Sequence, residues 1–151
     1  MLPTGLEKPV VVVDWYNTLW VGNQVPAENL ASLEKLASSC HVTLLSYVGS
    51  SNRAKVVKED MELHIPSHLG QMLPKEICYN KIGVNGKCYW AYEFGAWAIF
   101  NDCKAAIKEC QQWGLDAYPI NTKQEHHEWA GGGYETFADA VEAYLQKQAA
   151  K

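Results

Sequence analysis

The chain has 151 residues, of which 48% are hydrophobic, a length and composition typical of one globular domain and not of a disordered chain. Its formal net charge is -4, its pI is about 5.7 and it contains no run of Lys or Arg, which argues against binding through nucleic-acid phosphates. No apolar run approaches the roughly 18 residues of a membrane span, and nothing resembles a signal peptide. We therefore expect a single cytoplasmic domain over residues 1–151, without a membrane partner. The five cysteines lack Cys-x-x-Cys spacing and are expected to be reduced thiols, mostly in the core.

The first predicted strand is a run of four valines, residues 10–13, and it ends at Asp14. Consecutive β-branched residues are typical of a strand buried on both faces of a parallel sheet. A small hairpin with a Gly-Asn turn is predicted at residues 20–25, followed by a helix over residues 26–38. Ligands of open α/β sheets bind beyond the carboxyl ends of the strands. Asp14 is therefore a candidate site residue, although Asp is also common in turns.

The rest of the chain alternates between strand and helix patterns. Further strands are predicted at residues 41–46, 76–80, 96–100 and 115–120, and further helices at residues 53–63, 103–113 and from residue 136 onward. A short aromatic-rich helix is expected after a turn at residues 83–86. This order predicts an α/β domain: a three-layer, Rossmann-like parallel sheet of about five strands with the first strand central. No segment remains for a cap domain.

Polar residues end three of the predicted strands, namely Asp14, Ser46 and the pair Asn101-Asp102. The carboxyl ends of parallel strands share one edge, and Lys87 lies in a segment that returns to it. A carboxylate can attack phosphorus, and two carboxylates can share a Mg²⁺ ion. A hydroxyl and an ammonium can stabilise the phosphoryl oxygens. The set is therefore typical of phosphoryl transfer, with Lys81 as the alternative to Lys87.

The order of these residues resembles the haloacid dehalogenase-like (HAD) superfamily of phosphatases and related hydrolases. The motifs that carry the resemblance are residues 10–14 with Tyr16, Thr18 and Leu19, then residues 44–46, Lys87 and residues 99–102. The predicted hairpin stands where the family has its flap, directly after a short turn called the squiggle. The resemblance implies a HAD-like fold without a cap domain and a Mg²⁺-dependent phosphatase.

The resemblance also implies a role for each site residue. Asp14 would be the nucleophile and a Mg²⁺ ligand, and the backbone carbonyl of Tyr16 would be a second ligand. Asp102, with Asn101, would hold the metal from the opposite side. Ser46 would bind a phosphoryl oxygen, and Lys87 would hold Asp14 and the phosphoryl group together. Tyr16 would complete the catalytic set. The residues expected on the substrate side of the crevice are Trp15, Asn17, Thr18, Trp20 and Tyr47.

Tyr16 departs from the family pattern, because phosphatases of this kind usually carry a second Asp there as the general acid and base. An unperturbed Tyr has a pKa of about 10 and cannot act as a base near neutrality. Three functions therefore stay open: a phosphatase of a bulky or macromolecular phosphorylated substrate, an impaired pseudo-phosphatase that binds a ligand or a protein partner over the open crevice, and, more remotely, a 2-haloacid dehalogenase. The dehalogenase branch carries a Tyr at this position, but a dehalogenase has to exclude water from its carbon centre.

Overall fold

A computed structural model describes residues 8–48, 51–70, 75–79, 86–93, 95–121 and 133–150. Five strands form one sheet: β1 (Val10–Val13), β2 (His41–Val48), β3 (Lys75–Tyr79), β4 (Ala98–Asn101) and β5 (Asp116–Pro119). The strand order is β3-β2-β1-β4-β5, and every neighbouring pair is parallel. The valine strand therefore lies at the centre of a parallel five-stranded sheet, which confirms the predicted fold class.

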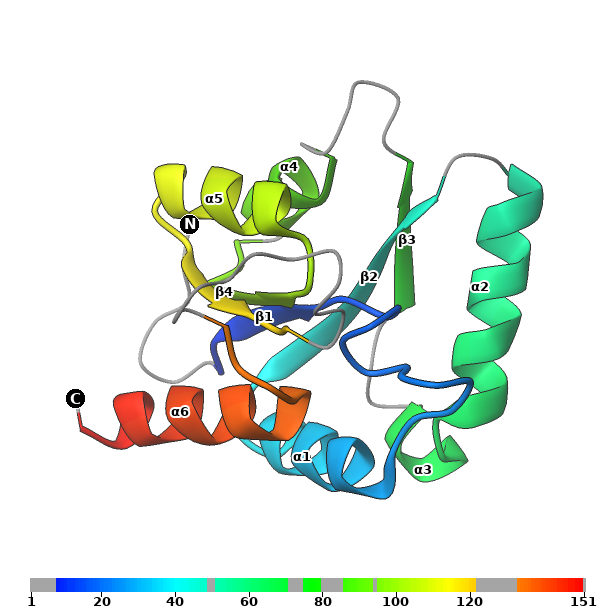
Figure 1. The fold of residues 1–151 in the computed structure, drawn as a ribbon, viewed down its shortest axis with the longest axis horizontal. Coiled ribbons are helices and arrows are strands. Elements are labelled where there is room, and N and C mark those ends of the chain that lie inside the picture. The colour runs from blue at the N-terminus through cyan, green and yellow to red at the C-terminus, as the bar shows by residue number, and fades with distance from the viewer. Residues whose placement is uncertain are drawn as a thin grey trace.

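The helices cover both faces of this sheet. They are α1 (Ala27–Ala37), α2 (Ser51–His64), α3 (Ser67–Gly70), α4 (Gly86–Glu93), α5 (Lys104–Gln112) and α6 (Phe137–Ala149). Figure 1 shows α4 and α5 on one face, α1 and α6 on the other, and α2 beside β3. The described part of the chain thus forms three layers with no added cap domain, as predicted. No helix within it has the length and hydrophobicity needed to cross a membrane.

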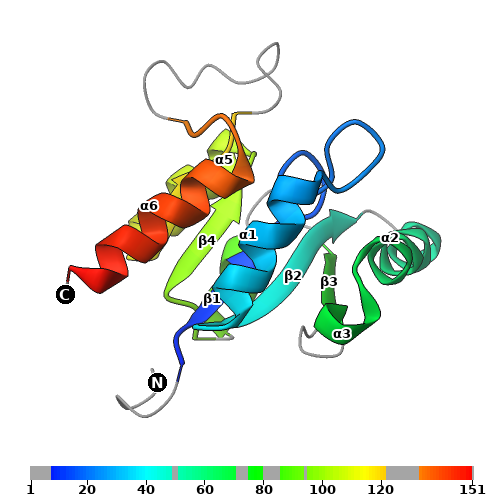
Figure 2. The ribbon, with the colours of Figure 1, turned by 90° about the horizontal axis from the view of Figure 1, so that it is seen from below.

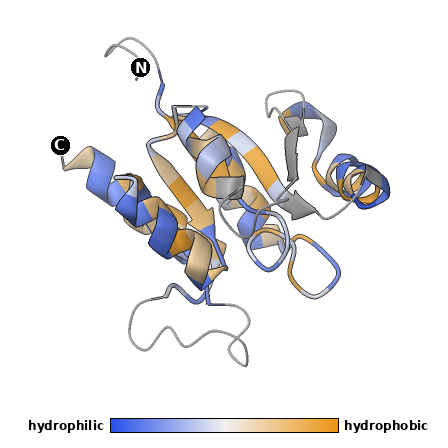
Figure 3. Ribbon diagram, turned by 90° about the horizontal axis from the view of Figure 1, so that it is seen from above, coloured by the Kyte–Doolittle hydropathy of each residue, from blue (hydrophilic) through white to orange (hydrophobic). Residues whose placement is uncertain are grey.

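The two faces of the central strand enter different hydrophobic cores. Val11 and Val13 belong to the core beneath α1 and α6, and Val12 belongs to the core beneath α4 and α5. All three side chains are at most 1% exposed. Burying a valine side chain contributes roughly 1.5–3 kcal/mol, so both faces of the strand stabilise the sheet. Figure 3 shows hydrophobic residues concentrated on the central strands. An alternating pattern would have left one face in water, and the uninterrupted valine run excludes that.

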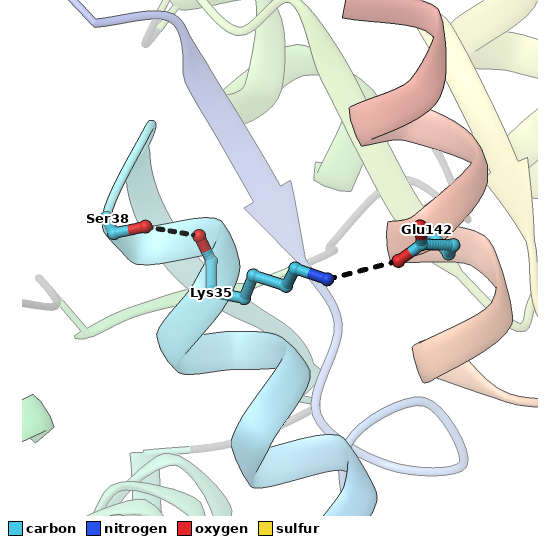
Figure 4. A network of polar contacts seen from close by, with 3 residues as sticks. All are labelled: Lys35, Ser38 and Glu142. Atoms are coloured by element: carbon cyan, nitrogen blue, oxygen red, sulfur yellow. Dashed lines mark hydrogen bonds and ion pairs between the residues drawn. The ribbon is translucent and has the colours of Figure 1, made fainter. Parts of the chain in front are cut away.

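The helices α1 and α6 lie side by side on their face of the sheet and are joined at the surface by an ion pair. Lys35 Nζ donates to Glu142 Oε2 at 3.3 Å, and Ser38 Oγ donates to the carbonyl oxygen of Lys35 at 2.7 Å near the end of α1 (Figure 4). The two charged side chains are 62% and 55% exposed. An exposed pair contributes at most about 1 kcal/mol, so the buried side chains between these helices hold them together.

Candidate functional site

Polar residues from the central strands and from the segments that follow them lie at the carboxyl edge of the sheet. The N–H of Asp14 donates to the carbonyl oxygen of Phe100 at 2.9 Å, which extends the pairing of β1 with β4 by one residue. Because Val13 pairs with Phe100, Asp14 lies beside Asn101, and Asp102 follows one residue further. The structure therefore places the carboxyl groups predicted to share a metal at the ends of adjacent strands.

Ser46 reaches the same edge from the other side of β1. Val13 pairs with Leu44, so Ser46 lies two residues beyond that pair in β2, and its side chain is 2% exposed. Lys87 is described by its backbone alone, as the second residue of α4, a helix that begins after the carboxyl end of β3. The side chain of Tyr47 and the whole of Lys81 lie outside the described residues. The choice between Lys87 and Lys81 stays a prediction.

The Asp14 carboxyl group is almost completely removed from water. Asp14 is 3% exposed, and the hydroxyl of Thr18, itself 0% exposed, donates to Asp14 Oδ2 at 3.2 Å. Asp102, at the end of the neighbouring strand, is 9% exposed. Burying an ionised carboxylate is costly unless hydrogen bonds or a cation compensate it. Carboxylate oxygens are usual ligands of Mg²⁺, so two carboxyl groups at one edge are a candidate cation site.

A tight turn after Asp14 carries Thr18 back over the carboxylate. The carbonyl oxygen of Trp15 accepts from three successive N–H groups, those of Thr18 at 3.5 Å, Leu19 at 3.1 Å and Trp20 at 2.9 Å. Asn17 has a φ of 61° in the left-handed region, which Asn tolerates better than most residues. This tight turn explains why the hydroxyl four residues after Asp14 can reach its side chain.

The predicted hairpin follows the turn. The N–H of Val21 donates to the carbonyl oxygen of Gln24 at 2.8 Å, and Gly22 and Asn23 have φ angles of 62° and 68°. Positive φ at both central residues is the signature of a type I′ turn, as expected for this Gly-Asn sequence. Figure 2 shows the loop after β1, in blue, beyond the arrowheads of the strands and next to the start of α1. The hairpin prediction is therefore confirmed.

Asn29 of α1 forms hydrogen bonds with this loop. The sequence did not single it out as a site residue. Asn29 is 2% exposed, and its Nδ2 donates to the carbonyl oxygens of Thr18 at 3.2 Å and Leu19 at 3.1 Å. The signal was available in the spacing, because Asn29 stands four and seven residues before the buried Leu33 and Leu36. An amide on the inward stripe of a helix needs a polar partner, and the loop after β1 supplies it.

The Tyr16 side chain contacts residues of α2, and these contacts argue against a catalytic role for its hydroxyl. Burial raises the pKa of the Tyr16 hydroxyl above 10.0, the nearby Arg53 lowers it, and the Asp60 carboxylate, which accepts a hydrogen bond from the hydroxyl, raises it further. The Arg53 guanidinium lies 5.5 Å from the centre of the Tyr16 ring. Tyr16 is therefore protonated at neutral pH, and its hydroxyl is held by α2. This geometry removes Tyr16 as a general base.

The two tryptophans of this loop have different environments. Trp15 is 0% exposed and belongs to the core, so it offers no surface to a substrate, and that expectation is corrected. Its ring centre lies 5.6 Å from that of Trp20, and Trp20 packs edge-on against His64 of α2 at 4.5 Å. Thr18 is also completely buried, and its role is to support Asp14. Trp20 retains partial exposure and stays a candidate contact.

Asn101 presents an unused donor at this edge. It is 0% exposed, its Oδ1 accepts from the N–H of Cys103 at 3.0 Å, and its Nδ2 has no hydrogen-bond partner among the described residues. An unsatisfied buried donor costs about 1–3 kcal/mol. An amide nitrogen suits a ligand oxygen, whereas a cation requires the amide oxygen that Cys103 already engages. The geometry thus favours Asn101 as a ligand donor over its predicted role as a metal ligand.

The donor chemistry of the edge fits Mg²⁺ better than a transition metal. The described residues contain no group of three or more His, Cys, Asp or Glu side chains that could hold a metal ion. Mg²⁺ is commonly bound by one or two carboxylates together with waters and ligand phosphates, and Asp14 and Asp102 meet that requirement. The Mg²⁺ site stays a prediction.

Two open cavities lie at the opposite, amino edge of the sheet. One of about 450 Å³ is lined by Tyr92 and Trp113, whose ring centres are 5.1 Å apart. The other, of about 530 Å³, is lined by Asp116 and Lys147, which form an ion pair at 3.0 Å. Neither cavity includes a predicted site residue, so the carboxyl edge remains the candidate site on chemical grounds.

The fold and the buried carboxylates together define an α/β domain with a parallel sheet and a candidate ligand site at its carboxyl edge. No family model and no curated protein matches the chain. Among solved structures, the chain is similar to a universal stress protein in complex with cAMP, with a TM-score of 0.48 and 10% sequence identity. The match covers 78% of this chain and 99% of that one.

These findings correct the predicted function. The similar structure is that of a universal stress protein and not of a phosphatase. The raised pKa of Tyr16 and its hydrogen bond to Asp60 also leave that position without the general acid and base that aspartyl-phosphate chemistry requires. The prediction of a HAD-like hydrolase, with its pseudo-phosphatase and dehalogenase alternatives, is therefore withdrawn. The sheet order and the positions of Asp14, Ser46 and Asp102 do not depend on it.

Proposed function

We propose that the carboxyl edge of the sheet binds Mg²⁺ together with a phosphate-bearing ligand. The observation that carries the proposal is the position of Asp14, 3% exposed at the end of the central strand, beside β4, which Asp102 follows. A divalent cation between the two carboxylates would take both as oxygen ligands. Mg²⁺ retains open positions when two carboxylates hold it, and phosphate oxygens are its usual further ligands.

Donors for the phosphate lie beside the carboxylates. The Nδ2 of Asn101 is buried and has no partner among the described residues, so a ligand oxygen would satisfy it. The hydroxyl of Ser46 and the first turn of α4, which contains Lys87, belong to the same edge. We assign no chemical step to the site, since Tyr16 stays protonated. The proposed ligand is a phosphorylated molecule, free or part of a macromolecule, in the cytoplasm.

The loop between β1 and α1 supports a family proposal of its own. Its tight turn over residues 15–20 and its type I′ hairpin follow a strand that leads into a carboxylate, in the order in which the squiggle and flap follow the first motif of the HAD superfamily. We propose a HAD-like ancestry on this basis. Ancestry does not imply activity, because one fold hosts many functions.

Isothermal titration calorimetry with MgCl₂, followed by inorganic phosphate in the presence of Mg²⁺, tests the proposal. We expect Mg²⁺ to bind the wild type, and Asp14→Asn to weaken its affinity at least about tenfold, or about 1.4 kcal/mol. Asp139→Asn is the matched control, because it removes the same charge from an exposed position in the first turn of α6. Phosphate should bind only when Mg²⁺ is present, and Ser46→Ala should weaken phosphate more than Mg²⁺.

Three results would overturn this proposal. The first is the absence of Mg²⁺ binding to the wild type. The second is an equal loss of affinity in Asp14→Asn and Asp139→Asn, which would make the effect one of net charge. The third is Mg²⁺-independent binding of cAMP, the ligand of the similar universal stress protein, that Asp14→Asn leaves unchanged.

A further inference from the structure

Two large aromatic rings are exposed together where α4 and α5 end, at the amino edge of the sheet. Tyr92 lies in the last turn of α4 and is 58% exposed, and Trp113 directly follows α5 and is 41% exposed. Their ring centres are 5.1 Å apart and their planes meet at 80°, so the two rings form a corner. Large apolar side chains that are exposed side by side, unlike single ones, indicate a binding surface.

This corner forms part of the wall of the open cavity of about 450 Å³, and the side chain of Glu93 lines the same cavity. Trp113 Nε1 donates to Glu109 Oε1 at 3.0 Å, which orients the indole ring and places a second carboxylate beside it. The face of an aromatic ring carries negative partial charge, and the chain as a whole has a formal net charge of -4. Rings and carboxylates of this cavity therefore attract a cation and repel an anion.

We propose that this cavity, the amino-edge pocket, binds an arginine side chain of a partner protein. A guanidinium is planar and always charged, it stacks on aromatic faces, and it donates two parallel hydrogen bonds to one carboxylate. The Tyr92 and Trp113 rings supply the faces, and Glu93 supplies the carboxylate. A lysine ammonium has no flat face and is more strongly hydrated, so it uses only part of this arrangement. An uncharged apolar partner would remove Glu93 from water without a compensating charge.

The neighbouring cavity of about 530 Å³ indicates how the partner would lie. The residues that line both cavities are Ala96, Gly114 and Leu115. In the second cavity, the Asp116 carboxylate already forms an ion pair with Lys147 at 3.0 Å. The arginine therefore occupies the end that Glu93 lines, and the chain that carries it extends over the shared residues. This pocket lies at the opposite edge of the sheet from the proposed Mg²⁺ site, so the inference does not depend on that site.

The test titrates the ¹⁵N-labelled full chain with a capped peptide of one arginine between two glycines. Binding is followed by NMR at the backbone amide of Gly114, which lines the pocket. The matched peptide carries citrulline, which has the shape of arginine without its charge. We expect the arginine peptide to shift the Gly114 resonance saturably and the citrulline peptide to bind at least about tenfold more weakly. The corresponding lysine peptide should bind at least about threefold more weakly than the arginine peptide.

Substitutions within and outside the pocket complete the test. Tyr92→Ala and Glu93→Gln should each weaken the arginine peptide at least about fivefold, because each removes one part of the recognition. Tyr89→Ala is the matched control, since it removes a ring that is 50% exposed on the same helix but does not line the pocket. It should leave the affinity unchanged. Equal binding of the arginine peptide and either the citrulline or the lysine peptide would overturn the proposal. So would an unchanged affinity in Glu93→Gln, or equal losses in Tyr89→Ala and Tyr92→Ala.

Discussion

Replacing Asn29 by Ala tests whether α1 holds the loop that carries Thr18. The substitution removes two buried hydrogen bonds, from Nδ2 to the carbonyl oxygens of Thr18 at 3.2 Å and Leu19 at 3.1 Å. Each such bond contributes about 0.5–1.5 kcal/mol, and a carbonyl left unsatisfied costs about 1–3 kcal/mol. Against this, Ala gains about 0.5 kcal/mol of helix propensity. It also removes Asn29 Oδ1, which has no hydrogen-bond partner in the described part of the chain.

We therefore expect Asn29→Ala to lower the free energy of unfolding by about 2 kcal/mol, which for a chain of this length corresponds to a fall of roughly 4–8 °C in Tm. Urea unfolding followed by tryptophan fluorescence measures it, because Trp15 and Trp20 flank the loop. The urea midpoint should fall with little change in the denaturant slope.

A second substitution separates the hydrogen bonds from the shape of the side chain. Asn29→Asp keeps the size of the side chain but presents a carboxylate to two carbonyl oxygens, so it replaces attraction by repulsion. We expect Asn29→Asp to destabilise the protein more than Asn29→Ala does. If Asn29→Asp were as stable as the wild type, or milder than the alanine variant, the donor role of Asn29 would be refuted.

Three further predictions concern the core and the surface. Phe100→Ala should cost about 3–5 kcal/mol in urea unfolding because the ring is 0% exposed, and a cost below about 1 kcal/mol would contradict its place in the core. Glu142→Gln should change the free energy of unfolding by less than about 1 kcal/mol, since its ion pair with Lys35 is exposed. A larger loss would contradict the small contribution expected of an exposed ion pair. Burial raises the pKa of the Tyr144 hydroxyl above 10.0. The stabilising contribution of the protonated Tyr144 is thus complete below about pH 10 and is lost as pH rises further. The urea midpoint should therefore fall less between about pH 8 and pH 11 in Tyr144→Phe than in the wild type. An equal fall in both proteins would refute the titration of Tyr144 as its cause.

The sheet was predictable from the sequence because its signals are local. Four adjacent valines require burial on both faces, and β1 is the central strand. Gly22 and Asn23 both tolerate positive φ, and both have positive φ in the hairpin. The boundaries were less accurate: the fourth strand begins at Ala98 and not at residue 96, and α2 begins at Ser51 and not at residue 53. Pairing with β1 and β5 decides where β4 begins.

The site was predictable in its positions but not in its contacts. The predicted strand ends placed Asp14, Ser46 and Asp102 near one edge, since parallel strands share their direction, although β2 continues past Ser46 to Val48. The contacts of Tyr16, the position that decided between functions, could not be predicted in this way. They come from Arg53 and Asp60 on α2, some forty residues later in the chain. A hydrogen bond between residues so far apart in the chain produces no periodic pattern in the sequence.

The same reasoning explains why the loop after β1 matters more than any one side chain at the edge. Its turn holds Thr18 against Asp14, Asn29 holds the turn, and the α2 residues hold Tyr16 away from a catalytic role. Each of these contacts positions a carboxylate or removes a base, and none supplies a proton donor to a leaving group. Asp14 is desolvated, which strengthens its attraction for a cation, and none of these described contacts performs a proton transfer. Binding is therefore the function that we propose for this edge, and the titration of Asp14→Asn against Asp139→Asn tests it.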